Sequence, residues 1–180
     1  MVITQLIKLH VNELRQAAPR LHAGDKLLLS GKVYTARDAA HKRLMGLLDN
    51  GSPLPFDLTD SVIYYCGSTP APEGGIIGAC GPTTSSRMDP YTPRLYDLGV
   101  CATIGKGERD AATCAAIQRC GGVYLCAIGG AGALAARHIT ACRVIAFDDL
   151  GCEAIKELEL SDFPVFVAED CHGASLFRRP

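Results

Sequence analysis

Short apolar runs alternate with helix-like segments along this chain, and that alternation constrains its fold more than any other feature. Strands are expected at 2–9, 26–34, 61–66, 100–104, 123–128, 143–147, 156–160 and 165–168. Helices are expected between them at 11–18, 35–48, 91–98, 109–119 and 131–137. Elements that alternate in this way build sheets covered by helices, so the sequence predicts a layered α/β or α+β domain.

No repeat, low-complexity tract or linker divides the chain, so residues 1–180 are expected to form one domain that buries its own core. The net charge of −1 excludes a global field that would recruit nucleic acid or an anionic membrane surface. No apolar run approaches the ~18–20 residues that span a bilayer, and the first residues lack the pattern of a signal peptide. We therefore expect a cytoplasmic protein with no nucleic-acid or membrane partner.

Nine cysteines raise the question of a metal cluster or of disulfides. They stand at 66, 80, 101, 114, 120, 126, 142, 152 and 171, and no two of them form Cys-x-x-Cys. The odd count and the missing signal peptide favour free thiols in a reducing compartment, most of them packed as small apolar side chains. Because local ligand spacing is absent, we expect no metal site within this chain.

The segment Gly-Pro-Thr-Thr-Ser-Ser-Arg-Met-Asp at 81–89 concentrates four hydroxyls and an arginine behind a turn. It follows the apolar run 75–80, which predicts that it begins where a strand ends and a helix starts. Hydroxyls and backbone N–H groups at a helix N-terminus bind anions, and Arg87 adds a fixed positive charge. The segment is therefore the first candidate for a functional site.

Two further cations occupy comparable places. Thr35 and Asp38 fit a variant capping box, which puts Arg37 in the first turn of a helix. Lys106 lies between a predicted strand and the next predicted helix. A cation at a helix N-terminus is unfavourable by ~0.3–1 kcal/mol, so Arg37, Arg87 and Lys106 together suggest that an anion neutralises them.

A plainer interpretation exists for each of these residues. Any one of the cations taken alone is more typical of a solvated surface, or of a partner to a neighbouring carboxylate such as Asp38 or Asp89. The three together, beside the hydroxyl-rich segment, favour a functional site. His41 lies one turn after Arg37 on the same helix face, where it is a general acid or base, a hydrogen-bond donor to a ligand, or a packed or surface histidine.

Two glycine motifs imitate nucleotide-binding signatures. The pair Gly105-Lys106 lacks both the earlier glycine and the following Ser or Thr of a phosphate-binding loop. The run 130–135 matches G-x-G-x-x-A after a predicted strand, with Asp148 near the expected distance for a ribose-binding acid. Small residues that permit close packing explain this run better, and an anion-binding turn or a dinucleotide site are the alternatives.

The sequence resembles the β subunit, or C-terminal half, of class I iron–sulfur fumarate hydratases and of the related L-tartrate dehydratases. Six segments carry the resemblance, in order and over most of the chain. They are Leu-Ser-Gly-Lys-Val-Tyr-Thr-Ala-Arg-Asp-Ala-Ala-His-Lys-Arg (29–43), the segment 81–89 above, Ile-Gly-Lys-Gly (104–107), Gly-Gly-Ala-Gly-Ala (129–133), Asp-Leu-Gly-Cys-Glu-Ala (149–154) and Asp-Phe-Pro (162–164).

The resemblance implies a swivelling three-layer β/β/α domain that completes an active site with an α partner, in an αβ hetero-oligomer. The partner is expected to hold a [4Fe–4S] cluster through three cysteines of its own. The family pattern gives substrate-binding roles to Arg37, Thr84, Arg87 and Lys106, and makes Thr83 the catalytic base. Three further residues are expected to support them: Asp38, His41 and Ser85.

The leading hypothesis is a β subunit that hydrates fumarate to (S)-malate reversibly and is active only with its α partner. A tartrate dehydratase β subunit, which would convert tartrate to oxaloacetate, is the nearest alternative, although the segment 149–162 looks more like the fumarase branch. A stand-alone anion-binding module and a dinucleotide-binding protein are the hypotheses from other classes.

Overall fold

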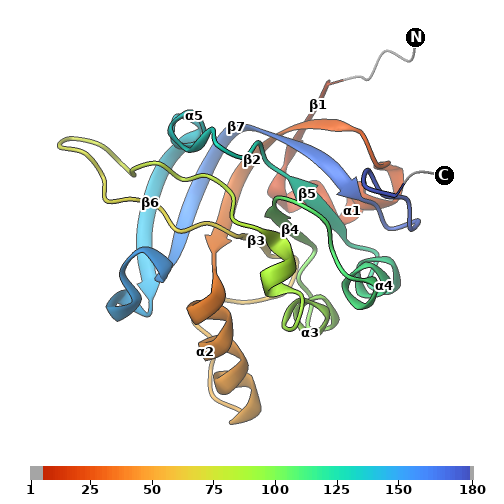
Figure 1. Cartoon of the computed structure of the whole chain (residues 1–180), viewed down its shortest axis with the longest axis horizontal. Coiled ribbons are helices and arrows are strands. Elements are labelled where there is room, and N and C mark those ends of the chain that lie inside the picture. Colours follow the sequence, from red (N-terminus) through yellow and green to blue (C-terminus); the bar gives the residue numbers. More distant parts are fainter. Residues whose placement is uncertain (1–5, 179–180) are drawn as a thin grey trace.

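The computed structural model describes residues 6–178, and within them one seven-stranded mixed sheet organises the fold (Figure 1). The strand order is β1-β2-β3-β4-β5-β7-β6. The strands are β1 Leu6–His10, β2 Lys26–Thr35, β3 Val62–Tyr64, β4 Ala102–Gly105, β5 Val123–Cys126, β6 Ile139–Ala146 and β7 Ile155–Glu169. The expectation of a mixed α/β fold is confirmed.

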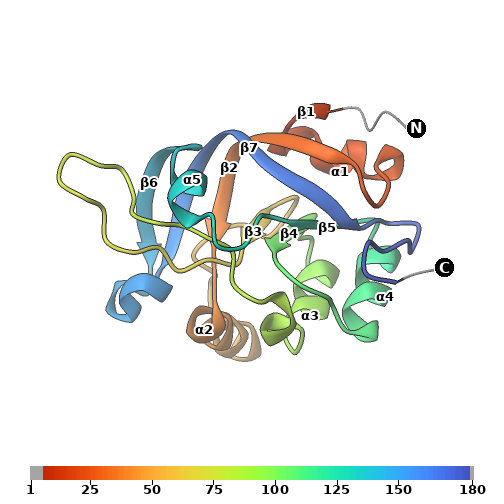
Figure 2. The same ribbon diagram turned by 45° about the horizontal axis from the view of Figure 1, so that its top comes forward.

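The sheet is partly closed into a barrel (Figure 2). Strands β1 to β5 pair in parallel with their neighbours, whereas β7 runs antiparallel to β5 and β6. Strand β7 also pairs, through residues 157–166, with nearly the whole length of β2, so that the ladder β2-β3-β4-β5-β7 returns to its first strand. The carboxyl ends of β2, β3 and β4 consequently meet at one edge, where parallel sheets usually bind ligands.

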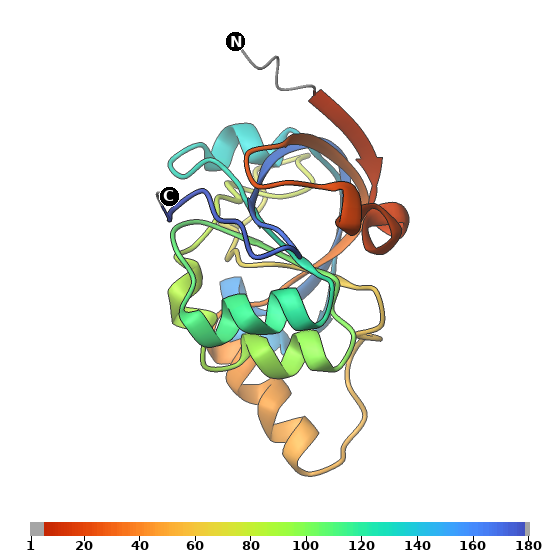
Figure 3. The ribbon, with the colours of Figure 1, turned by 90° about the vertical axis from the view of Figure 1, so that its right-hand side faces the viewer.

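The longer helices lie together on one side of the sheet (Figure 3). These are α2 Asp38–Asp49, α3 Thr92–Asp97 and α4 Ala111–Arg119, while α1 Leu14–Ala17 and α5 Gly132–Ala136 lie apart from them. Four 3₁₀ helices complete the described part of the chain: η1 Val11–Glu13, η2 Ala18–Arg20, η3 Ser85–Met88 and η4 Asp148–Glu153. No helix within residues 6–178 combines the length and the apolar character needed to cross a membrane.

Both faces of the central strands are buried. In β3, Val62 and Tyr64 belong to the largest apolar cluster, whereas Ile63 and the following Tyr65 pack against α2 and α3. Successive side chains of a strand point to opposite faces, so a strand buried on both sides is apolar throughout. This explains why β3 reads as an uninterrupted apolar run.

The predicted helix at 35–48 begins three residues late, and the predicted capping box is wrong. Thr35 is the last residue of β2, where its buried hydroxyl donates to Ala154 O (3.3 Å) and accepts from Lys156 N (2.9 Å). Arg37 is the N-cap residue of α2, and its side chain makes no capping hydrogen bond. Contacts with β7, over a hundred residues later, therefore decide the conformation of Thr35.

Two strand predictions also need correction. The ranges 156–160 and 165–168 form the single strand β7, which continues through Asp162 despite its left-handed φ of 47° because β2 pairs with it on both sides. The apolar run 75–80 is no strand; it belongs to a long loop, 67–81, that extends from the body of the protein (yellow in Figure 1). Residues 2–5 of the first predicted strand lie outside the described residues, and the swivelling three-layer arrangement stays a prediction.

Candidate functional site

The hydroxyl-rich segment is fixed at the sheet edge through its backbone. Thr83 N donates to Tyr65 O (2.7 Å), and Ser85 N donates to Lys106 O (2.9 Å). Lys106 N in turn donates to Ser85 Oγ (3.0 Å), and Thr84 forms a parallel bridge with Lys106. The structure thus brings together two predicted site segments that are twenty residues apart.

The predicted helix N-terminus in this segment is wrong. Ser85–Met88 is a single 3₁₀ turn, with Thr84 as its N-cap and no side-chain cap. A turn this short has few aligned peptide dipoles, so it offers little attraction for an anion. Arg87 lies inside this turn, and only Arg37 adjoins the start of a full-length helix. The segment 83–88 itself therefore contributes to anion binding mainly through its side chains.

Arg37 and Arg87 meet at one carboxylate. Arg87 forms a fork with Asp38, with Nε 2.9 Å from Oδ1 and Nη2 2.8 Å from Oδ2. Nη2 of Arg37 lies 3.5 Å from the same Oδ2, and 3.8 Å from Glu153. We call these four residues the arginine cluster. The plainer interpretation, that Asp38 is a partner of the two arginines, is confirmed by these contacts.

Arg37 is held in a confined position. Its guanidinium lies against Gly67, where an added Cβ would stand only 2.9 Å from Nη1. Its side chain is 21% exposed, yet Nε is buried and has no hydrogen-bond partner among residues 6–178. A buried donor without a partner costs about 1–3 kcal/mol. Within the described residues the cluster therefore retains an unsatisfied buried donor.

His41 is a buried residue of α2 that contacts the backbone of Arg37. Its ring is completely buried and lies edge-on to Tyr65 (5.4 Å between centroids) and stacked on Tyr91 (5.7 Å). Nδ1–H donates to Arg37 O (2.9 Å), which fixes the tautomer. Burial lowers the pKa of His41 to about 4, so the ring is neutral at pH 7. Among the interpretations of His41, the geometry favours the packed histidine that positions Arg37.

Lys106 differs from the two arginines. It is partly buried, and no carboxylate of residues 6–178 lies within ion-pair distance of its ammonium. Its side chain runs beside Gly129, whose ideal Cβ position is 3.3 Å from Lys106 Cδ. The segment 83–87 thus has an unpaired cation at one end and the arginine cluster at the other.

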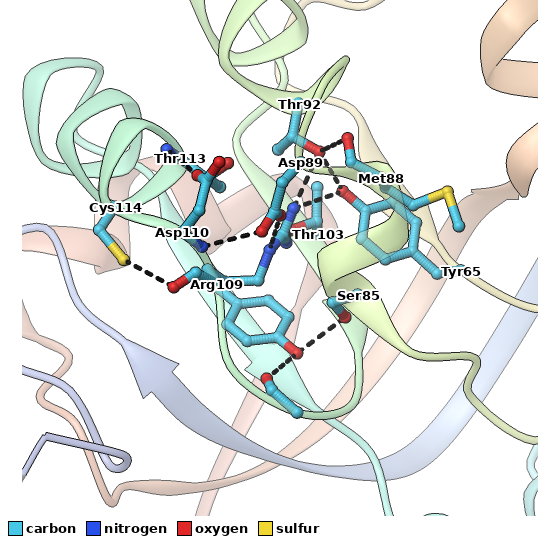
Figure 4. A network of polar contacts seen from close by, with 12 residues as sticks. Tyr65, Ser85, Met88, Asp89, Thr92, Thr103, Arg109, Asp110, Thr113 and Cys114 are labelled. Atoms are coloured by element: carbon cyan, nitrogen blue, oxygen red, sulfur yellow. Dashed lines mark hydrogen bonds and ion pairs between the residues drawn. The ribbon is translucent and has the colours of Figure 1, made fainter.

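A buried ion pair underlies this segment (Figure 4). Nε of Arg109 donates to Asp89 Oδ1 (2.6 Å), and the two side chains are 0% and 4% exposed. The remaining guanidinium nitrogens bond to three hydroxyls: Thr92 Oγ1 (2.8 Å), Thr103 Oγ1 (3.1 Å) and Tyr65 OH (3.3 Å). The pair is fully enclosed by polar partners, as a buried charge requires.

Tyr124 connects this ion pair to the site. Its hydroxyl lies 2.8 Å from both Ser85 Oγ and Gly107 O, and the Arg109 guanidinium stacks over its ring at 4.8 Å. Asp89 Oδ2 also accepts from Asp110 N (2.8 Å), the cap residue of α4. We call Asp89, Arg109 and Tyr124 the buried network. It fixes the backbone on both sides of Lys106.

Sequence reasoning missed the role of the buried network. Asp89 was a candidate partner for a cation, but the cation it pairs with is Arg109, twenty residues later. A lone arginine before a helix carries no spacing signal, because pairs of this kind form through the tertiary fold. The only clue in the sequence was the Asp110–Thr113 helix start directly behind Arg109.

The glycine-rich run 130–135 packs against the loop that precedes the site. Cys80 N donates to Gly132 O (3.0 Å), and a Cβ on Gly132 would stand 3.0 Å from Gly81 N. Strands β5 and β6, which flank the run, are not neighbours, and β6 pairs antiparallel with β7. A dinucleotide fingerprint needs a parallel βαβ unit, so close packing is the better explanation.

The cysteines do not form a ligand set. All nine are free, of which three are buried and five partly buried, and no group of three or more His, Cys, Asp or Glu within residues 6–178 is arranged to hold a metal ion. Cys66 and Cys80 lie side by side, with their sulfurs 3.0 Å apart, and burial raises the pKa of the Cys66 thiol. The described residues therefore do not fit an iron–sulfur cluster.

The sequence of this chain is similar to those of several known proteins. The sequence is 36% identical over 175 residues to fumarate hydratase 2 of Leishmania major, covering 96% of this chain and 31% of that protein. It is 38% identical over 156 residues to the aerobic class I fumarate hydratase of Escherichia coli K12, covering 86% of this chain and 28% of that protein.

A third relative is much shorter. The putative L(+)-tartrate dehydratase subunit beta of Methanocaldococcus jannaschii is 38% identical over 164 residues, covering 88% of this chain and 84% of that protein. The chain thus spans about three-tenths of the fumarate hydratases but most of the tartrate dehydratase subunit. The family described as "Fumarase C-terminus" matches residues 3–180. This chain is a member of the fumarase C-terminal family.

Proposed function

We propose that this chain is the β-type part of a fumarate hydratase that converts fumarate to (S)-malate reversibly. The observation that carries the proposal is the convergence of Arg37 and Arg87 on Asp38, beside an exposed Thr84 and an unpaired Lys106. Fumarate has two carboxylates, and a pair of arginines with a separate lysine supplies cations for both. Family membership supports the same assignment.

In this proposal each side chain has a distinct task. Arg87 and Arg37 hold one carboxylate of the substrate, since guanidinium groups bind carboxylates through two parallel hydrogen bonds. The Arg37 side chain is 21% exposed, so part of it is accessible to a substrate. Lys106 and Thr84 bind the other end of the substrate. Without substrate, Asp38 forms ion pairs with both arginines, and the substrate carboxylate competes with Asp38 for Arg87.

Thr83 is the proposed base. Its backbone N–H is fixed to Tyr65 O (2.7 Å), and its hydroxyl makes no hydrogen bond to another residue of 6–178. A threonine hydroxyl is a weak base unless neighbouring groups activate it. We propose that activation arises in the assembled enzyme. Ser85 and His41 act indirectly, Ser85 by holding Lys106 and His41 by holding Arg37.

We propose further that an α-type partner carries the [4Fe–4S] cluster, because the described residues here offer no ligand set for it. Residues 1–180 would then act as one swivelling domain of the β/β/α type that closes the site in an αβ assembly. The tartrate dehydratase subunit supports a separate β chain, since it matches this chain over 84% of its own length. The same observation favours tartrate dehydration as the second candidate activity.

The test is an anaerobic co-expression of this chain with an α-type subunit, assayed with fumarate, (S)-malate and tartrate. Replacing Arg87 with Met removes the fork but keeps the length of the side chain. Charge-assisted hydrogen bonds contribute about 1.5–3 kcal/mol each, so kcat/KM is expected to fall by at least about tenfold. Arg94→Met is the matched control, because Arg94 is similarly exposed and pairs with Asp49 outside the site.

Each outcome separates the hypotheses. Turnover of fumarate that is lost in Arg87→Met and kept in Arg94→Met supports the proposal. Turnover of tartrate but not of fumarate supports the second candidate. Full activity in Arg87→Met contradicts the assigned site, and dicarboxylate binding by the chain alone, without any activity in the assembly, identifies an anion-binding module.

A further inference from the structure

A second cation lies buried on the other side of the arginine cluster. Lys156, on β7, is only 9% exposed and lines a cavity of about 340 Å³, together with Ser68 and Cys152, the two residues that its ammonium contacts. The cavity lies between η4, β6 and residues 68–71 and 76–77 of the loop 67–81, and Figure 1 shows that loop beside β6. Its volume is at the small end of the range for ligand pockets, roughly 300–1,000 Å³.

The charge of Lys156 has no counter-charge in the described part of the chain. Its ammonium donates to two neutral acceptors, Ser68 Oγ (3.0 Å) and Cys152 O (3.3 Å), which leaves one of its three N–H donors without a protein partner. The carboxylates nearest in sequence are engaged elsewhere. Glu153 accepts from Ala39 N and lies near Arg37, and Glu157 pairs with Lys32 and Arg143.

A buried ammonium normally has an anionic partner, because charge is costly to remove from water without one. The remaining walls of the cavity are uncharged and mostly apolar, and include Pro70, Ala71, Ile76, Ile77 and Cys142. We propose that this cavity binds a short-chain monocarboxylate, with its carboxylate on Lys156 and its alkyl chain against Ile76 and Ile77. The apolar lining disfavours a second carboxylate on the same ligand.

This site is distinct from the proposed dicarboxylate site but adjoins it. Gly67 separates them, since an added Cβ there would stand 2.9 Å from Arg37 Nη1 and 3.3 Å from Cys152 O. The neighbouring Ser68 hydroxyl contacts the Lys156 ammonium directly. A ligand on Lys156 would therefore hold the Gly67–Ser68 backbone against which Arg37 rests. The inference does not depend on which reaction the assembled enzyme performs.

The experiment is a titration of the ¹⁵N-labelled full chain with butyrate, followed by amide NMR. Signals of Ser68, Cys142 and Cys152 are expected to shift together, with a Kd on the order of 1 mM. Lys156→Met should weaken binding at least tenfold, whereas Lys42→Met, at an exposed lysine on α2, should not. Acetate should bind more weakly than butyrate, and inorganic phosphate more weakly still.

Two further variants keep the test decisive even if Lys156→Met does not fold. Ala71→Phe fills the mouth of the cavity from an exposed loop position and leaves Lys156 in place, so it should also abolish the butyrate shifts. Lys106→Met should bind butyrate normally, which separates this site from the dicarboxylate site. The proposal is overturned if Lys156→Met binds butyrate as tightly as the unaltered chain, if phosphate binds as well as butyrate, or if no shifts occur at all.

Discussion

Two of the arginine–aspartate pairs in the molecule, Arg109–Asp89 and Arg87–Asp38, have the same chemistry but opposite surroundings. Arg109 and Asp89 are 0% and 4% exposed, and three hydroxyls satisfy the rest of the guanidinium. Arg87 and Asp38 are 50% and 34% exposed, and the guanidinium of Arg87 contacts no other side chain of residues 6–178 by hydrogen bond or ion pair. The first pair is closed to ligands, and the second is open to them.

The difference shows how one short stretch of chain combines rigidity and availability. Asp89 and Arg87 are two residues apart, yet one faces the buried network and the other faces solvent. The buried pair anchors the carboxyl end of the segment 83–89, so the exposed arginine is presented from a fixed backbone. A preorganised cation binds an anion more tightly than a mobile one. Mutations at the two pairs should therefore separate stability from ligand binding.

The largest expected effect is at Asp89. Asp89→Asn leaves the Arg109 charge buried without a counter-charge, and breaking a buried pair costs about 3–5 kcal/mol of folding free energy. The measurement is the free energy of unfolding in urea. Asp38→Asn, at the exposed pair, is the control and should cost no more than about 1 kcal/mol. Equal losses in the two variants would show that Asp89 and Arg109 do not form the scaffold of the segment.

His41 lies between the two pairs and should make stability depend on pH. Its pKa is lowered by burial to about 4, against 6.5 in an unfolded chain, so the unfolded state binds more protons between these values. The free energy of unfolding therefore rises with pH across this window, by about 3 kcal/mol in total. Unfolding in urea at pH 7, 6 and 5 measures it.

The control for this prediction is His41→Leu, which removes the titrating group and retains an apolar side chain. It should flatten the part of the pH dependence between 4 and 6.5, although it loses the bond to Arg37 O. The Arg87→Met variant should keep the full slope, because Arg87 contributes nothing to the burial of His41. A slope that survives in His41→Leu would mean that other groups produce it.

The order of secondary structure could largely be predicted from the sequence, because the central strands β3, β4 and β5 are short buried runs and the helices between the strands are bounded by turn residues. The closure of the barrel could not. It depends on the pairing of β7 with β2, which are more than a hundred residues apart and leave no local pattern. The capping box at Thr35 failed for the same reason, since the start of β7 and the residue before it, Ala154, supply the partners of its hydroxyl.

The candidate site was likewise predictable only in part: its residues could be selected from the sequence, but their contacts could not. Arg37, Arg87 and Lys106 could be selected because their residue types and positions after strands are visible in the sequence. The contacts among these residues could not be predicted, because the fork from Arg87 to Asp38 joins residues that are 49 positions apart. Buried charges such as Arg109 are harder still. A charged residue is read as exposed by default, so only its tertiary partners show that it belongs to the interior.

A smaller effect is expected at Tyr124, which joins the two regions. Tyr124→Phe removes the hydroxyl between Ser85 Oγ and Gly107 O but keeps the ring beneath Arg109. Losing these bonds should cost about 1–2 kcal/mol of folding free energy, and KM for the dicarboxylate should rise because Lys106 is less well held. Tyr34→Phe is the control, since the Tyr34 hydroxyl makes no hydrogen bond within residues 6–178. A loss of stability without any change in KM would separate the buried network from the site.

The smallest effect on stability is expected where the effect on function is greatest. Arg87→Met and Arg94→Met each remove one exposed arginine from an ion pair. Exposed pairs contribute about 0–1 kcal/mol, so urea unfolding should barely distinguish either variant from the unaltered chain. Only Arg87→Met should lose dicarboxylate binding in the assembled enzyme. If Arg87→Met instead destabilised the chain as strongly as Asp89→Asn, the exposed pair would be part of the scaffold, and its arginines would not be free to exchange Asp38 for a substrate.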